Sequence, residues 1–198
     1  MELKEIIEHL KVNTGCNNTE IAHMLGITKT TVGRWLNGEI KNIQEETAVR
    51  LSELVGFDVK GAINGESVTF NKPILGFAKA GYDLFLDENY LGQEETTYQD
   101  YLRGDFFLKV KGESMIGEGI MNNSLVFVKK TNVVHNKDIA VIMVGNEVTI
   151  KKVIFKDDTL ILEAANPTVE NRYFSKKEIE TLPVKIIGKV LYSKTEFN

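Results

Sequence analysis

The sequence has little of what several classes of protein require. Cys16 is the only cysteine in 198 residues, so the chain has neither a disulfide framework nor a metal site built from several cysteines. Three prolines and 16 glycines are too few for a collagen-like chain or a disordered chain rich in these residues. Basic residues (24) do not outnumber acidic ones (28), so the net charge of -4 by itself gives no indication of nucleic-acid binding.

Long hydrophobic runs are also absent. The most apolar stretch, residues 139–144, is far shorter than the roughly 20 residues that a membrane-spanning helix needs. The first five residues, Met-Glu-Leu-Lys-Glu, are charged and lack the apolar centre of an export signal. Because 42% of the residues are hydrophobic, the chain can still bury one large core or two small ones. We expect a cytoplasmic protein without a membrane partner.

Helical periodicity dominates the first 60 residues. Within the first ten, apolar residues recur at i, i+3, i+4 and i+7, which predicts an amphipathic helix. Similar but shorter patterns predict a second helix ending at Gly26 and a third ending before Asn37. A fourth is expected to start near Asn42, where Glu45 three residues later resembles a capping box, and to end at Gly56.

Short β-rich segments with frequent alternation replace this pattern from residue 73 onward. Turn residues separate them, such as Gly-Asn at 145–146 and Asp-Asp at 157–158. We therefore predict two domains, an all-α bundle followed by a mainly-β domain. Their expected ranges are 1–60 and 73–198, joined by a linker at 61–72.

Residues 17–36 have the spacing of a helix-turn-helix. Ala22 is small where the two helices would cross, and Gly26 can take the positive φ of a tight turn. The outward face of the third helix carries no carboxylate, so this helix can lie in the major groove and donate to bases or phosphates. That face consists of Lys29, Thr30, Thr31 and Arg34.

An ordinary helical bundle with a solvated polar face is the alternative, because the first 66 residues carry 7 basic and 10 acidic side chains. However, the segment resembles the helix-turn-helix of lambda-type phage repressors over about 55 residues. The resemblance implies that Asn18, at the start of the second helix, lies beside a phosphate and that the four face residues lie near bases. Gly33 costs the third helix about 1 kcal/mol relative to Ala, which a close approach to DNA would explain.

Few residues are available for catalysis in familiar patterns. None of the three histidines has a Ser or Cys partner at a known spacing, which argues against a Ser-His-Asp or Cys-His site. No His, Cys and Asp cluster has the spacing of a metal site, so we expect no metal and no cofactor. There remain Ser114 and, 37 residues later, Lys151. A serine hydroxyl needs a base, and a lysine can serve if burial lowers its pKa. Taken alone, this pair is weak evidence.

The order and spacing of several motifs resemble those of the LexA and CI-like self-cleaving repressors. Pro-Ile-Leu-Gly-Phe-Ala-Lys-Ala-Gly at 73–81 resembles their cleavage segment, in which an Ala-Gly bond is cut. The other matching motifs are Gly-Glu-Ser-Met at 112–115, Gly-Ile-Met at 119–121, Val-Thr-Ile-Lys-Lys at 148–152 and Leu-Glu-Ala-Ala-Asn-Pro at 162–167. The resemblance implies a LexA-like Ser-Lys peptidase domain with its cleavage segment at 73–90.

The same resemblance assigns a role to individual residues. It implies that Ser114 is the nucleophile and Lys151 the general base. The implied scissile bond is Ala80–Gly81, and the implied oxyanion donors are the backbone N–H groups of Glu113 and Ser114. Lys152 is the alternative base, but it points to the opposite side of a strand.

One motif departs from the family pattern. Asn-Asn-Ser at 122–124 stands where the family usually has Asp-Gly-Asp. This departure leaves open the geometry of that turn and of a possible dimer contact.

The resemblance thus implies a dimeric transcriptional repressor of phage or prophage type that binds a two-half-site operator in double-stranded DNA. Cutting Ala80–Gly81 would separate the DNA-binding domain from the dimerisation domain and release the operator. The resemblance also implies a trigger, which is a recombinase filament formed on single-stranded DNA after DNA damage. Such a repressor would act in the SOS response and in lysogeny. In the bacterial cell the operator-bound protein would be associated with the nucleoid.

Three alternatives remain at this point. In the first, the peptidase fold serves only for dimerisation, and an antirepressor protein that binds it causes induction. A peptidase that cuts other proteins is a second alternative, although related signal peptidases need a membrane anchor. A regulator that senses a small molecule is the third, and it would need a ligand pocket.

Overall fold

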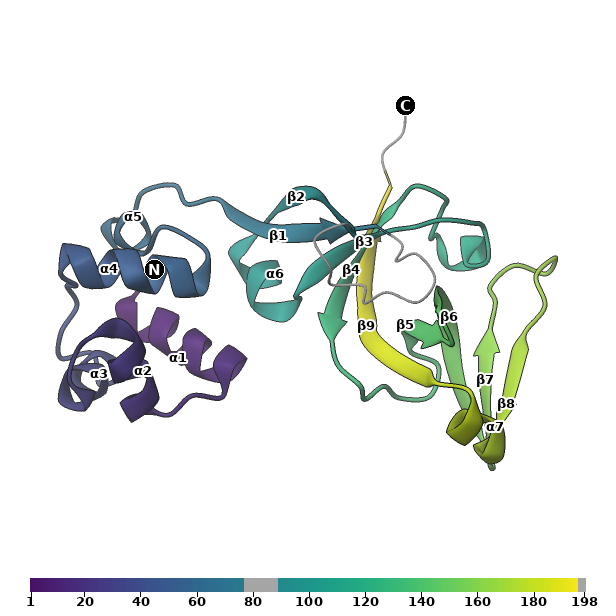
Figure 1. Cartoon of the computed structure of the whole chain (residues 1–198). Coiled ribbons are helices and arrows are strands. Elements are labelled where there is room, and N and C mark those ends of the chain that lie inside the picture. The colour runs from purple at the N-terminus through teal and green to yellow at the C-terminus, as the bar shows by residue number, and fades with distance from the viewer. Residues whose placement is uncertain (77–88, 196–198) are drawn as a thin grey trace. The chain divides into compact units, whose positions relative to one another are not determined.

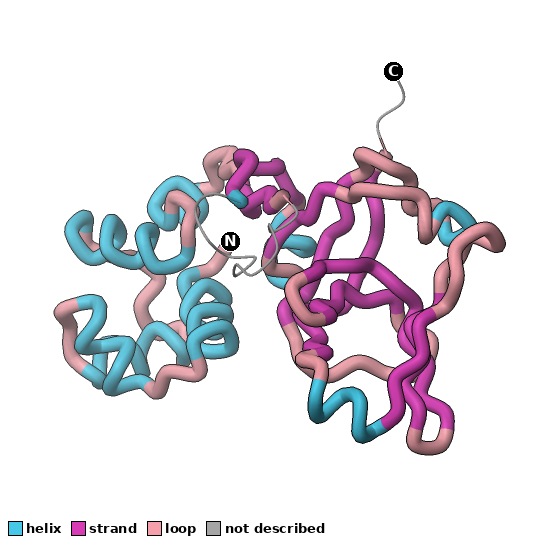
Figure 2. The backbone as a smooth tube through the Cα atoms, turned by 45° about the vertical axis from the view of Figure 1, so that its right-hand side comes forward, coloured by secondary structure: helices cyan, strands magenta, loops and turns pink. Residues whose placement is uncertain are grey.

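The computed structural model describes residues 1–76 and 89–195. The chain forms two compact units, one comprising Met1–Asn71 with Glu95–Tyr98 and the other Lys72–Glu94 with Gln99–Asn198. The first unit is mostly helical and the second mostly strand (Figures 1 and 2), which confirms the predicted fold class. Ala80 and Gly81, the predicted scissile bond, lie outside the described residues.

The helical unit is built from short amphipathic helices. Their apolar stripes meet in one core, in which Ile6, Leu25 and Val32 are almost fully buried. Trp35 is the largest side chain of this core and is 3% exposed. The helices are α1 (Leu3–Thr14), α2 (Asn18–Leu25), α3 (Lys29–Leu36), α4 (Glu45–Val55) and α5 (Val59–Asn64).

Two expectations for this unit were wrong. The fourth helix begins at Glu45 rather than near Asn42, and no capping box forms, because Gln44 is the N-cap and its side chain accepts no hydrogen bond. A fifth helix, α5, occupies the start of the predicted linker. Asp58 caps it by accepting a hydrogen bond from the Lys60 N–H.

Strand β1 then begins at Phe70, so residues 65–69 alone lie between the last helix and the first strand. The predicted linker at 61–72 is therefore partly structured.

In the described residues, nine strands form one sheet in the order β2-β1-β3-β4-β9-β5-β6-β7-β8. Strand β1 pairs with β3 in parallel, and the pairings from β3 through β8 are antiparallel. Figure 2 shows that the sheet is strongly curved rather than flat. The strands are β1 (Phe70–Leu75), β2 (Tyr90–Thr96), β3 (Phe106–Lys109), β4 (Leu125–Lys130), β5 (Ile139–Val144), β6 (Glu147–Lys156), β7 (Thr159–Glu163), β8 (Arg172–Ser175) and β9 (Val184–Lys194).

Alternation along the strands explains why the sheet buries apolar side chains on both faces. In β5, Ala140, Ile142 and Val144 belong to one apolar cluster, whereas Val141 belongs to another that includes Met115. The expected turns also form, because Gly145 and Asp157 take positive φ values of 60° and 51° between their strands.

Short helical segments complete this unit: α6 (Tyr98–Arg103), the 3-10 turn η2 (Ile116–Glu118) and α7 (Lys176–Thr181). The connection from β3 to β4 carries η2 and Ser114, and β6 carries Lys151. No helix in the described ranges is long and apolar enough to cross a membrane.

Candidate active site and nucleic-acid interface

The segment from Val110 to Ser124 holds Ser114 in a fixed loop. Gly112 takes φ +98°, and its N–H donates to the side-chain oxygen of Asn122 at 2.9 Å. The carbonyl of Ser114 accepts a 2.8 Å hydrogen bond from the Ala165 N–H, just past the end of β7. Met115 directly after Ser114 is 2% exposed and belongs to the apolar core. The serine is therefore anchored on both sides.

Asn166 adds a further anchor to the residue before the serine. Its side chain is buried, and its amide group donates to the carbonyl of Glu113 at 2.9 Å. Its amide oxygen in turn accepts from the N–H and the hydroxyl of Thr168, at 3.0 and 2.9 Å. Because both polar atoms of the Asn166 side chain have partners, its amide orientation is determined, and the backbone at Glu113 is held with it.

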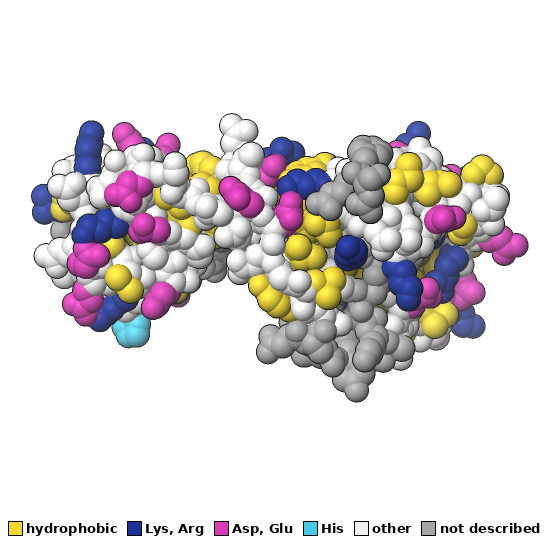
Figure 3. Space-filling view, turned by 90° about the horizontal axis from the view of Figure 1, so that it is seen from above, with side chains coloured by type: hydrophobic (Ala, Val, Ile, Leu, Met, Phe, Trp, Pro, Cys, Tyr) yellow, Lys and Arg dark blue, Asp and Glu magenta, His cyan; other side chains and the backbone are white. Residues whose placement is uncertain are grey.

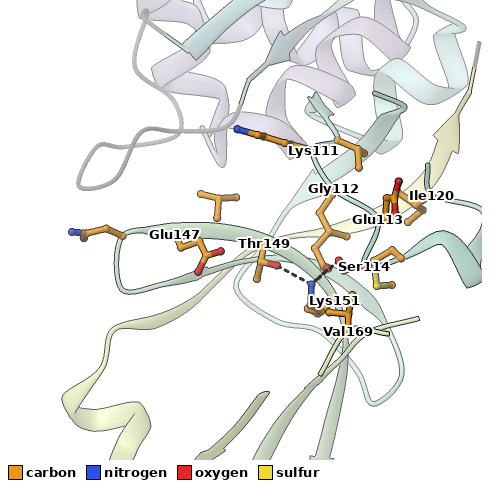
Figure 4. A pocket seen from close by; sticks show the side chains of 14 residues that line it. Lys111, Gly112, Glu113, Ser114, Ile120, Glu147, Thr149, Lys151 and Val169 are labelled. Atoms are coloured by element: carbon orange, nitrogen blue, oxygen red, sulfur yellow. Dashed lines mark hydrogen bonds between the residues drawn. The ribbon is translucent and has the colours of Figure 1, made fainter. Parts of the chain in front are cut away.

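Lys151 lies on β6 with its amino group beside the serine. Its Nζ is 2.7 Å from Ser114 Oγ and 3.1 Å from both Thr149 Oγ1 and the carbonyl of Ile150. Figure 4 shows the three side chains of Ser114, Thr149 and Lys151 pointing toward one another. Lys151 is only 6% exposed. The structure thus brings together the two residues that the resemblance pairs.

Burial changes the electrostatics of this lysine. Loss of hydration lowers the pKa of Lys151 below its usual value, because a charged ammonium is disfavoured in an apolar environment. Two nearby charges act in opposite directions, since Glu147 raises the pKa of Lys151 and Arg172 lowers it. Arg172 and Glu147 also form an ion pair with each other at 3.3 Å. Desolvation has the largest effect, so the neutral form of Lys151 is more readily populated than that of a lysine in water.

The neighbouring Lys152 is in a different environment. Its ammonium forms an ion pair with Glu118 and lies 4.0 Å from Glu163. The hydrogen bond that Lys152 Nζ donates to Glu118 Oε1 raises the pKa of Lys152 and stabilises its charged form. Consecutive strand residues point to opposite sides, and here one lysine is desolvated while the next is paired with carboxylates.

A cavity of about 510 Å³ opens beside Ser114 and Lys151. Apolar side chains supply much of its wall, among them Ile120, Ile150 and Val169. Glu113 and Ser114 are also among the residues that line it, and their backbone N–H groups donate to no other residue in the described part of the chain.

The unusual turn at Asn122, Asn123 and Ser124 has a regular geometry. Asn123 takes φ +68°, a conformation that asparagine tolerates better than most residues other than glycine. The Ser124 hydroxyl is buried and lies 2.9 Å from the hydroxyl of Thr195. The segment therefore forms a defined turn, and Asn122 also helps to hold Gly112 in the serine loop.

The helical unit contains the predicted helix-turn-helix. Gly26 ends α2 with φ +67°, and its N–H donates to the carbonyls of Ala22 and His23. Thr28 caps α3 by accepting from the Thr31 N–H. Ala22, at the crossing of the helices, is 4% exposed.

The residues predicted to contact DNA differ in their surroundings. Lys29, Thr30 and Arg34 are exposed on α3. Thr31 is half-buried, and its hydroxyl lies 2.9 Å from that of Thr28, so it also takes part in the cap. Asn18 is the first residue of α2, and its side-chain oxygen accepts a 2.7 Å hydrogen bond from Lys11 Nζ.

Two further observations concern the helical unit. A Cβ built on Gly33 would meet no atom within 4 Å, so packing inside the described protein does not explain this glycine. On the face of the helical unit that Figure 3 shows, basic and acidic side chains are interspersed, so this face carries no broad positive field.

Comparison with known proteins shows which family combines a helix-turn-helix unit with a β-rich unit of this kind. Residues 73–191 match the Peptidase S24-like family, and residues 3–60 match a helix-turn-helix family. A LexA repressor of Desulfitobacterium hafniense is 32% identical over 185 residues, covering 87% of this chain and 82% of the relative. The chain belongs to the LexA family. It is a DNA-binding repressor with a capacity for self-cleavage.

Other LexA repressors show the same relationship. That of Thermotoga petrophila is 30% identical over 176 residues, covering 86% of this chain and 76% of the relative. That of Thermotoga maritima is 43% identical over 86 residues, covering 43% and 41% of the two chains. The match to the Thermotoga petrophila protein extends across both units of this LexA-family repressor, so the similarity is not limited to the peptidase.

Three residues that the structure places at these sites were given no role in the interpretation of the sequence. Thr149 contacts Lys151 Nζ, Asn166 holds the backbone of Glu113, and Glu39 contacts Arg34. Thr149 could have been found, because residues two apart in a strand share a face. Asn166 and Glu39 lie in loops, whose conformations produce no periodic pattern in a sequence. Within the described ranges, no group of three or more His, Cys, Asp or Glu side chains could hold a metal ion.

Proposed function

We propose that this LexA-family repressor reads its operator with α3 and inactivates itself by cutting Ala80–Gly81 with Ser114 and Lys151. The observation that carries the proposal is the 2.7 Å distance between Lys151 Nζ and Ser114 Oγ in a buried site. A general base must lie within hydrogen-bond distance of the proton that it removes, and this pair satisfies that condition.

The partners of Lys151 suit a neutral amine. Such an amine has two N–H donors and one lone pair. The two donors can bond Thr149 Oγ1 and the Ile150 carbonyl, which leaves the lone pair directed at the Ser114 hydroxyl. Thr149 is then a positioning residue for the base.

The reaction follows from this arrangement. Lys151 takes the hydroxyl proton while Ser114 Oγ attacks the carbonyl carbon of Ala80. The Glu113 and Ser114 N–H groups donate to the resulting oxyanion. As the bond to Gly81 breaks, the Lys151 ammonium returns its proton to the leaving amine. A water molecule, deprotonated by Lys151, then hydrolyses the ester and regenerates the serine.

The regulatory consequence depends on linked binding units. A single small helix-turn-helix unit binds one half-site weakly, and dimerisation through the β-rich unit raises the effective concentration of the second. Cleavage at Ala80–Gly81 would remove that link and release the operator. A recombinase filament on single-stranded DNA, formed after DNA damage, is the proposed stimulus, and it would act by favouring the cleavage-competent state.

The test is to incubate the purified chain in mildly alkaline buffer and to weigh the products by mass spectrometry. Fragments 1–80 and 81–198 are expected from the wild type. Ser114→Ala, Lys151→Ala and Gly81→Trp should remain intact. Cleavage of Ser114→Ala at the wild-type rate would contradict self-processing and favour a repressor that an antirepressor protein inactivates.

A further inference from the structure

The C-terminal end of α3 fixes one acidic residue beneath a residue of the proposed DNA-reading face. Gly38 takes φ +71°, which turns the chain back after the helix. The N–H of Glu39 then donates to the carbonyl of Arg34 at 2.9 Å. This backbone bond places Glu39 beside Arg34 whatever their side chains do.

The side chains of the two residues are also joined. Arg34 Nε donates to Glu39 Oε2 at 3.3 Å, and Asn37 Nδ2 donates to Glu39 Oε1 at 3.2 Å. Both carboxylate oxygens are therefore held. About half of each charged side chain is exposed (54% and 51%), and ion pairs so exposed contribute little to stability. Stability alone does not account for this arrangement.

The atom that Arg34 uses is informative. Arg34 uses Nε for its contact with Glu39. No residue in the described ranges accepts a hydrogen bond from the two terminal nitrogens of the guanidinium. The planar edge formed by these two nitrogens matches O6 and N7 of guanine in the major groove, which is the commonest specific contact of arginine with DNA. Holding Nε restricts a flexible side chain before DNA arrives and so reduces the entropy lost on binding.

We propose that Glu39 is a positioning residue for operator recognition, which orients Arg34 so that its terminal nitrogens read a guanine. This inference rests on the proposed use of α3 as the reading helix. The competing effect of Glu39 is simple repulsion of DNA phosphates by its negative charge. The two effects have opposite signs, because positioning strengthens binding and selectivity, whereas repulsion weakens binding to every sequence equally.

The experiment measures binding of the full chain to a duplex that the wild-type protein has selected from random DNA. Arg34→Ala identifies the base pair at which preference depends on Arg34, and we expect a guanine there. Glu39→Ala should bind the selected duplex roughly five- to tenfold more weakly than the wild type. It should also discriminate less between bases at that position, as expected for coupled neighbours. Glu39→Gln keeps an oxygen acceptor and should retain most of the preference. In the Arg34→Ala background, Glu39→Ala should have no such effect.

Two comparisons make the result decisive. Replacing the guanine by 7-deazaguanine removes N7 and should weaken wild-type binding more than binding by Glu39→Ala. Glu53→Ala, which removes an exposed carboxylate from α4, controls for the change in net charge.

The positioning role would be overturned if Glu39→Ala bound all duplexes as tightly as the wild type or more tightly, and if Glu53→Ala gave the same result. A base other than guanine at the Arg34-dependent position would also overturn it. Unchanged binding by Arg34→Ala would instead show that α3 does not read DNA in this way, and the proposed reading face would fail together with the inference.

Discussion

The two units place their proposed functional groups in opposite environments. In the helical unit, Lys29 and Arg34 are exposed on a short helix. In the β-rich unit, Lys151 is 6% exposed, and burial lowers its pKa. A group that binds a large polyanion must be reachable from solvent, whereas a lysine that removes a proton must lose part of its hydration. In the proposed function the same residue type would serve two tasks, and its burial would decide which.

The largest effect is expected from the pair of adjacent lysines. Lys151→Ala removes the proposed base and should reduce self-cleavage by at least about a hundredfold, within the range typical of general-base catalysis. Lys152→Ala removes an ion pair with Glu118 instead and should leave most of the cleavage rate. The rates are followed by gel densitometry in alkaline buffer. Equal loss in both variants would mean that burial does not distinguish the two lysines.

A shortened chain tests whether the helical unit depends on the β-rich unit. Protein ending at Ala80 should remain helical by circular dichroism but bind a full operator about a hundredfold or more weakly, because the second half-site loses its effective concentration. Fluorescence anisotropy at matched concentrations gives the two affinities. Equal affinities would show that the β-rich unit supplies no link.

Single changes on α3 should have intermediate effects. Lys29→Ala or Arg34→Ala should weaken operator binding by about 1–3 kcal/mol if the residue contacts a base, and should relax preference at one position. A phosphate contact should instead weaken all sequences alike. Both variants should cut themselves at the wild-type rate, which serves as the internal control. Unchanged affinity in both would place another helix in the groove.

Gly33→Ala should have a smaller effect, which is expected to increase stability but to decrease operator affinity. A methyl group at this position would meet no atom within 4 Å, so Gly33→Ala should raise the unfolding free energy of the helical unit by about 1 kcal/mol. The same methyl group should weaken operator binding if DNA approaches closely. Thermal denaturation and anisotropy provide the two values. A stabilised variant with undiminished affinity would mean that DNA does not require this glycine.

Periodic patterns in the sequence were sufficient for the fold class. The i, i+4 spacing of α1 and the alternation of β5 each reflect burial of one face, so they can be recognised without tertiary information. Elements without such a pattern were misplaced. The short helix α5 depends on a cap from Asp58, and the start of α4 at Glu45 is not marked by a capping side chain.

The candidate active site was predictable only in part. Ser114 and Lys151 are 37 residues apart, and the resemblance to a family, not spacing or composition, paired them. The burial of Lys151 depends on strands that pack against β6 from elsewhere in the chain, which a single sequence does not specify. The support from Asn166 likewise arises because the segment after β7 lies against the serine loop.

The pH dependence of self-cleavage tests the central proposal most directly. The reactive form of Lys151 is the neutral amine, so the first-order rate should rise with pH as the ammonium loses its proton, and then level off. Because burial lowers the pKa of Lys151, the midpoint should lie below 10.5, the usual value for lysine. The rate constant should not change with protein concentration, since the bond and both side chains belong to one chain. A rate independent of pH, or one that increases with protein concentration, would contradict intramolecular cleavage by Ser114 and Lys151.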